Sequence, residues 1–204
     1  MKKATVTILA AISLAMGAFA QGTIFLENTS AGGWINDYWW GVHYGGPLTV
    51  QVWVLPDTSL NGTISTNLAS AESMHAAVVA ACTYGAPDAS ITGNTVSGFD
   101  GVFNFGPVKL PHVGLDSSGN LALVMFTGSY WGSYPNLEGV VCFNNPTGGG
   151  GFPIPSLPAS LTGWDAAPLN SADLRLAVVP LPEPSTFAML GLGATGLLVS
   201  RRRK

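Results

Sequence analysis

The sequence predicts an all-β protein whose folded part is a single β-sandwich or jelly-roll-like domain of about seven strands. The first observation is that short segments of alternating or continuous apolar residues recur along the chain. The second is that Gly, Pro, Asn and Asp separate these segments at short intervals, as turns require. The third is that only one internal segment has a helical composition. Together these patterns favour packed antiparallel sheets over an α/β fold.

The expected strands come from local pattern. The segment 22–27 is the first, and 48–55 is the clearest, because strict alternation places two sets of side chains on opposite faces. One set is Leu48, Val50, Val52 and Val54; the other is Thr49, Gln51, Trp53 and Leu55. Further strands are expected at 90–96, 101–110 (with a break or bulge at Gly106-Pro107), 120–127, 139–143 and 173–179.

The remaining body consists of one helix candidate and two long loops. The segment 67–82 is rich in Ala and predicts a short helix capped by Ser70, although its Val78-Val79 pair also suits a strand. The glycine-rich and aromatic segment 28–46 and the Gly/Pro-rich segment 144–168 are expected to be loops.

The first 20 residues have the pattern of a secretory signal peptide. A basic start precedes a small apolar run, which forms the expected signal helix, and Ala18 and Ala20 form an A-x-A cleavage site before Gln21. Signal peptidase is therefore an expected processing partner. The mature body would span residues 21–180, which suits one domain with its own core.

The last residues have the composition of a short membrane span. The apolar run from Phe187 to Val199 has 13 residues, so a helix there would be about 20 Å long. A bilayer core is about 30 Å thick, so the expected transmembrane helix (about residues 186–200) is a poor permanent anchor. The basic cluster that follows should stay cytoplasmic, with the body on the periplasmic or extracellular side; it consists of Arg201, Arg202, Arg203 and Lys204.

The order of these parts resembles a known sorting signal. The triplet Pro182, Glu183 and Pro184 precedes the apolar run, and the basic cluster closes it. Residues 181–204 closely resemble the PEP-CTERM sorting domain of Gram-negative bacteria. The resemblance implies recognition of the triplet by exosortase, a membrane-embedded cysteine protease or transpeptidase, followed by tail removal and transfer of the body to the cell surface or medium. Family members commonly accompany exopolysaccharide and biofilm genes.

A looser resemblance concerns the body. Gln21-Gly22-Thr23 at the mature N-terminus and the late Gly128-Ser129-Tyr130 turn are similar to parts of small exported all-β proteins that end in this same tail. That group implies no activity.

Charge limits the partners of the body. Only Lys109 and Arg175 of the eight basic residues lie in it, against ten of the eleven acidic residues, so its net charge is −8. Nucleic acid binding needs clustered Lys and Arg, and is therefore excluded as an expectation. In an oxidising compartment Cys82 and Cys142 can form a disulfide, or can remain two buried thiols.

No pattern of residues nominates a reaction. The histidines His43, His75 and His112 are far apart in sequence, and the chain contains no nucleophile elbow or H-E-x-x-H pattern. We therefore expect no enzyme, cofactor or metal. The aromatic clusters suggest a glycan-binding platform formed by Trp39, Trp40 and Trp131, although such rings also fill domain cores.

Three functions remain as hypotheses. The first is a non-catalytic cell-surface or extracellular-matrix protein, delivered by its tail and associated with exopolysaccharide or biofilm. The second is a carbohydrate-binding module that uses surface aromatics. The third is a secreted hydrolase whose carboxylates are brought together only by the fold.

Overall fold

The computed structural model describes residues 21–29, 33–37, 42–128, 130–132, 136–149 and 156–179. The predicted signal peptide, the sorting triplet and the expected C-terminal membrane helix all lie outside these residues. Within the described part of the chain, none of the helices combines the length and apolarity needed to cross a bilayer.

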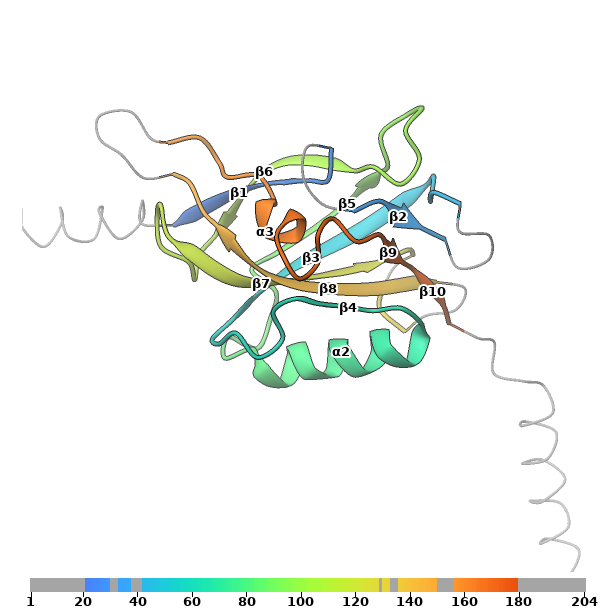
Figure 1. The fold of residues 1–204 in the computed structure, drawn as a ribbon, viewed down its shortest axis with the longest axis horizontal. Coiled ribbons are helices and arrows are strands. Elements are labelled where there is room, and N and C mark those ends of the chain that lie inside the picture. The colour runs from blue at the N-terminus through green and yellow to red at the C-terminus, as the bar shows by residue number, and fades with distance from the viewer. Residues whose placement is uncertain are drawn as a thin grey trace, which may run out of the picture.

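Strands far outnumber helices in the described chain, which supports the all-β class, and one large antiparallel sheet dominates the fold (Figure 1). Its strand order is β10-β8-β7-β3-β5, with β4 paired to β8. The bounds of these strands are Pro47–Leu55 for β3, Thr63–Ile64 for β4, Ala89–Asn94 for β5, Ser118–Phe126 for β7, Leu137–Pro146 for β8 and Ala177–Val178 for β10.

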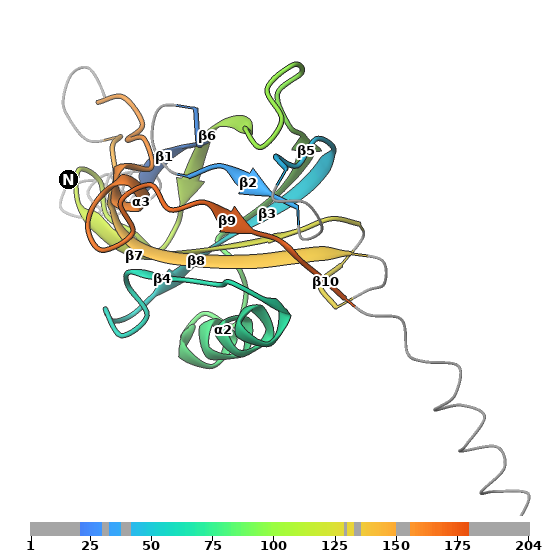
Figure 2. The same ribbon diagram turned by 45° about the vertical axis from the view of Figure 1, so that its right-hand side comes forward.

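Two smaller pairs complete the strands. β1 (Gly22–Glu27) pairs with β6 (Asn104–Leu110) in antiparallel fashion, and β2 (Ile35–Asn36) pairs with β9 (Leu174–Arg175) in parallel. The two helices are α2 (Leu68–Ala81) and the one-turn α3 (Thr162–Asp165). Figures 1 and 2 show α2 on one face of the large sheet, with the β1–β6 pair and α3 on the other.

The alternation predicted for β3 separates the two cores of the molecule. Leu48, Val50, Val52 and Val54 belong to the larger cluster beneath β1 and β6, while Trp53 and Leu55 pack in a second cluster with Val78 of α2. Both faces of this central strand are therefore buried. The large sheet is thus covered on both sides, and the apolar members of the two side-chain sets predicted for β3 lie in different cores.

The predicted bulge lies in β6. Phe25 pairs with Pro107 and Glu27 with Asn104, so one extra residue is inserted on β6 between these two pairs. Gly106 has a φ of +78° there, a conformation that glycine adopts without steric cost.

The predicted helix is also present, but its cap differs. The N-cap is Asn67, whose Oδ1 accepts from the Ser70 N–H at 2.9 Å, while the Ser70 hydroxyl accepts from the Asn67 N–H at 3.0 Å. Ser70 is therefore the third residue of a reciprocal capping box, and the prediction of Ser70 as the cap was wrong.

Three other boundaries moved because of tertiary contacts. β8 is longer than predicted because it continues through Asn144 and Asn145, which pair with β7 across from Asn120 and Gly119. The single last strand expected at 173–179 is divided into β9 and β10, which pair with different partners. The expected loops contain β2 and α3.

Candidate functional site

The described chain ends where the sorting tail begins, at the edge of the large sheet. β10 pairs with Leu137 and Glu138 of β8, and the Val179 N–H donates to the Asn136 carbonyl at 3.0 Å. Pro182 lies three residues after Val179. Because an extended residue spans at most about 3.6 Å, the sorting triplet begins within about 11 Å of the last hydrogen-bonded residue of the body.

The turn that joins β7 to β8 lies beside this exit and carries one predicted glycan residue. Trp131 is half-buried: its ring stacks on His75 of α2, with centroids 4.3 Å apart, and meets Phe126 edge-on at 6.3 Å. Burial lowers the pKa of His75, which favours the neutral ring in this stack. Trp131 therefore contributes packing to the second cluster, while its neighbour Tyr130 is 65% exposed.

A buried carboxyl holds this turn. The side chain of Glu138 is fully buried, and its Oε1 accepts from the Gly132 N–H. Its Oε2 has no hydrogen-bond partner among the described residues. Burial raises the pKa of Glu138, the bond from Gly132 opposes this shift, and the nearby charge of Glu72 adds to it. Glu138 thus fixes the turn, but the burial of its carboxyl group carries a desolvation cost.

A second aromatic cluster surrounds β2 and β9. Trp34 is 41% exposed and lies against His43, with ring centroids 4.2 Å apart. Asn36 joins the two elements: its Oδ1 contacts His43 Nδ1 at 2.8 Å and its Nδ2 donates to Asp173 at 3.1 Å. The Trp34 N–H also donates to Asp173, at 2.9 Å. An exposed indole therefore stands beside amide, imidazole and carboxylate groups. Trp39 and Trp40, predicted for a glycan platform, lie outside the described residues.

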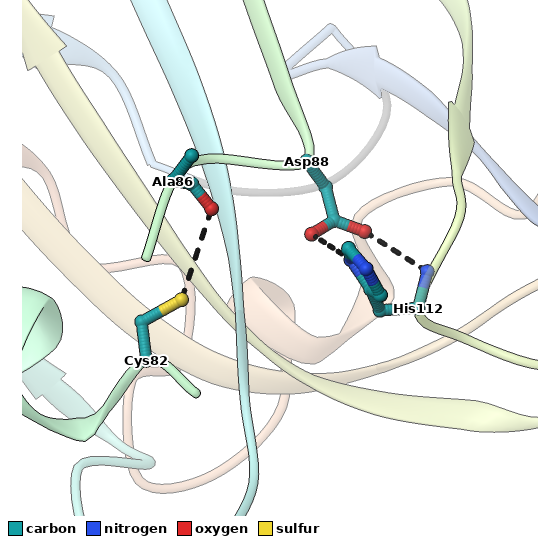
Figure 3. A network of polar contacts seen from close by, with 4 residues as sticks. All are labelled: Cys82, Ala86, Asp88 and His112. Carbon is teal, nitrogen blue, oxygen red and sulfur yellow. Dashed lines mark hydrogen bonds and ion pairs between the residues drawn. The ribbon is translucent and has the colours of Figure 1, made fainter. Parts of the chain in front are cut away.

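The two cysteines are free thiols in the structure, which corresponds to the second of the two predicted alternatives. Both are buried in the cluster beneath α2. The Cys82 thiol donates to the Ala86 carbonyl at 3.7 Å (Figure 3). Burial raises the pKa of Cys142 to about 11, against a smaller opposing effect of a hydrogen bond from Thr63. The Cys142 thiol is therefore not poised for reaction at neutral pH.

The structure reveals a polar pair that sequence reasoning missed. Asp88, at the start of β5, and His112, in the turn after β6, are 24 residues apart and lie in contact (Figure 3). Asp88 Oδ1 contacts His112 Nδ1 at 2.8 Å, and Oδ2 accepts from the His112 N–H at 3.1 Å. The Tyr84 ring stacks on the imidazole with centroids 3.5 Å apart. No sequence spacing signals this pair, because separate turns supply its members. Elsewhere in the described chain, no group of three or more His, Cys, Asp or Glu residues could hold a metal ion.

Comparison with protein families matches residues 180–204 to the PEP-CTERM protein-sorting motif. Comparison with curated proteins and with solved structures finds no match. The resemblance predicted for the tail is thereby confirmed, whereas the looser resemblance of the body remains a prediction.

Proposed function

We propose that this chain, which carries a PEP-CTERM protein-sorting motif, delivers a non-catalytic β-sandwich body to the cell surface or extracellular matrix. The motif at residues 180–204 carries the proposal. It implies an exported protein that the membrane holds transiently and that exosortase processes. In the proposed route, signal peptidase removes residues 1–20, the C-terminal helix holds the body outside the membrane, and exosortase then acts at Pro182, Glu183 and Pro184.

The C-terminal end of the described body supports processing close to the folded domain. β10 and Val179 hold the chain against β8 up to three residues before Pro182. Only two residues separate Val179 from Pro182, so the sequence leaves no long linker between the described body and the triplet. A processing enzyme in the membrane would meet the body and the triplet together, so that a folded body can be released as one unit.

The features of the body favour a structural or interaction role at the cell surface over a catalytic role. It has few charged side chains, its cysteines are buried, and its described residues form two packed cores on either side of one sheet. We propose that it serves as a structural or interaction component beside exopolysaccharide in a biofilm.

Carbohydrate binding is a second candidate, favoured by one observation. Trp34 is 41% exposed, its ring lies against His43 and its backbone N–H donates to Asp173; sugar recognition commonly combines an aromatic face with side chains that bind hydroxyls. Trp131 contributes less to this candidate, because its ring is held between His75 and Phe126.

The sorting proposal is tested by replacing Glu183→Ala and following the mass of the exported protein. We expect the variant to keep its tail, while the matched control Asp57→Ala, an exposed carboxylate of the body, is processed like wild type. Normal tail removal in Glu183→Ala would refute the role of the triplet. A glycan array with Trp34→Ala, and with Phe99→Ala (62% exposed) as the control, tests the second candidate. Equal binding by both variants and wild type would eliminate Trp34 as a sugar platform.

A further inference from the structure

A cleft of about 340 Å³ opens beside the Asp88–His112 pair. The end of β3, Tyr84 and the segment from the turn at 112–114 to the start of β7 line it, so three parts of the chain that are distant in sequence meet there. Its volume lies at the lower end of the range of small-molecule sites, about 300–1,000 Å³. The cleft is separate from both tryptophan clusters, since neither Trp34 nor Trp131 lines it.

The buried carboxylate of Asp88 fixes the orientation of the His112 ring, which lines this cleft. The Asp88 side chain has 0% of its surface exposed, whereas that of His112 is 37% exposed. A buried carboxylate is costly unless it is paired, and here both oxygens bind His112, one through the ring and one through the backbone. Because Asp88 occupies Nδ1, the imidazole keeps Nε2 on the opposite side of the ring. Nε2 accepts a hydrogen bond in the neutral ring and donates one in the charged ring, which suits a hydroxyl group in either state.

The walls of the cleft supply an aromatic face and further polar groups. Tyr84 is 48% exposed and stacks on His112 with an interplanar angle of 11°. Asn120 Oδ1 already accepts from Asn61 at 2.8 Å and from Asn144 at 2.9 Å, so its Nδ2 is the group left for a ligand. Ser117 and Ser118, whose side chains carry hydroxyl groups, also line the cleft. The site therefore combines one ring face with several short hydrogen-bonding groups.

Charge and polarity decide the ligand class. No Lys or Arg lines the cleft, and the Asp88 carboxylate lies directly against His112, so the cleft offers an anion no unpaired cationic side chain. One imidazole among the lining residues offers too few ligands for a metal ion. The imidazole, amide and hydroxyl groups would be left without partners by an apolar ligand. A neutral ring bearing hydroxyl groups satisfies them and stacks its C–H face on Tyr84.

We propose that this cleft binds a neutral saccharide unit. The proposal rests on the surface function above, in which the body lies beside polysaccharide, and it assigns that contact to Tyr84, His112, Ser118 and Asn120. The site differs from the tryptophan platforms expected from the sequence.

The three histidines of the chain make one experiment decisive, because each lies against a different aromatic cluster. His112 stacks on Tyr84 in the cleft, His75 stacks on Trp131, and His43 lies tilted against Trp34. Side-chain ¹H–¹⁵N NMR of the full chain in detergent would be recorded while glucose, galactose, mannose, N-acetylglucosamine and their neutral oligosaccharides are added. We expect the ring signals of His112 to shift and saturate, while those of His43 and His75 stay in place.

Variants then test the contacts at exposed positions, where folding is least at risk. Tyr84→Ala should weaken binding about tenfold, as loss of a stacked ring does. Ser118→Ala should weaken it about fivefold, as expected for one hydrogen bond. The matched control Tyr130→Ala removes a tyrosine that is also exposed but lies outside the cleft, and it should bind like wild type. Backbone amide spectra confirm that each variant is folded.

Several outcomes would overturn the cleft assignment. These are no shift of His112 with any of these sugars, shifts confined to His43 or His75, or unchanged affinity in a folded Tyr84→Ala variant. Tail removal in the wild type is measured in parallel by mass. Normal tail removal in a wild type that binds none of these sugars would reject the saccharide site alone, whereas failed tail removal in the wild type would reject the sorting function.

Discussion

Replacing Asn28 by alanine should destabilise the body through three hydrogen bonds that one side chain makes with three backbone groups. Asn28 follows β1 and is 7% exposed. Its Nδ2 donates to the carbonyls of Gly33 and Gly101, at 2.9 Å each, and its Oδ1 accepts from the Phe103 N–H at 2.7 Å. Asn28 therefore joins β1 to the segment before β6 and to the chain entering β2, where Trp34 lies.

The magnitude follows from these three bonds. A neutral hydrogen bond contributes about 1 kcal/mol net, and a buried group that loses its partner costs about 1–3 kcal/mol. Alanine removes all three bonds, and the Phe103 N–H and the Gly33 carbonyl lose these partners in buried positions, whereas the Gly101 carbonyl still accepts from the Ile35 N–H at 2.9 Å. We expect a loss of about 3 kcal/mol in the free energy of unfolding. That is a large fraction of the about 5–15 kcal/mol typical of a domain.

Urea unfolding of the full chain, followed by tryptophan fluorescence, measures this loss. Asn94→Ala is the matched control, since Asn94 is exposed at the end of β5 and should unfold like wild type. Asn28→Asp keeps the shape and the acceptor for Phe103, but places a second carboxylate oxygen opposite two carbonyls. It should be destabilised at neutral pH and partly recover in acid, where the protonated carboxyl can donate. A cost below about 1 kcal/mol for Asn28→Ala would refute the reasoning.

Three further predictions concern buried groups. Because burial raises the pKa of Glu138, the folded protein keeps this proton to higher pH than the unfolded chain, and stability is lost as the pH rises from near 4.5 through the folded value. Glu138→Gln should therefore flatten the change in urea midpoint between about pH 5 and about pH 8, and an unchanged slope would contradict it. Gly163→Ala would place a Cβ 1.8 Å from the Asn144 carbonyl oxygen and should lower the free energy of unfolding by about 3 kcal/mol. The control Gly114→Ala should be tolerated, because the nearest atom to its new Cβ is 3.6 Å away. Equal urea midpoints for the two variants would refute the close approach at Gly163. With a pKa of about 11, Cys142 should resist iodoacetamide at neutral pH while the protein is folded. When urea unfolds the protein without a reductant, both cysteines should be labelled, which mass spectrometry detects as two added labels. Absence of labelling would instead indicate a disulfide.

The strands could be predicted from local pattern because the side chains that a strand buries recur at a fixed spacing in the sequence. β1 has the bounds that its apolar run predicts, at 22–27. The period of two in β3 separates its two cores, and the Gly106-Pro107 pair indicates the bulge in β6. The tail is the clearest case, since its order of prolines, apolar run and basic cluster is itself the signal, matched at 180–204. These features depend on neighbours a few residues apart.

Partner choice could not be predicted in this way. Nothing near Asp88 indicates that its carboxyl lies under a histidine 24 residues later, and nothing in the segment 173–179 shows that it divides between two partner strands. Only packing determines that Trp131 lies on His75 while Trp34 remains exposed. The free state of Cys82 and Cys142 in one apolar cluster is likewise decided by tertiary position.

The amino-acid sequence by itself determined the strand class, the course of the central strand and the sorting tail, because periodicity and motif order are local properties of a chain. The tertiary structure alone decided that the tail leaves from a strand held at the sheet edge, and that Tyr84, His112 and Ser118 line one cleft. The physical reason is that side chains from distant segments come together only when burial of the two cores positions their backbones.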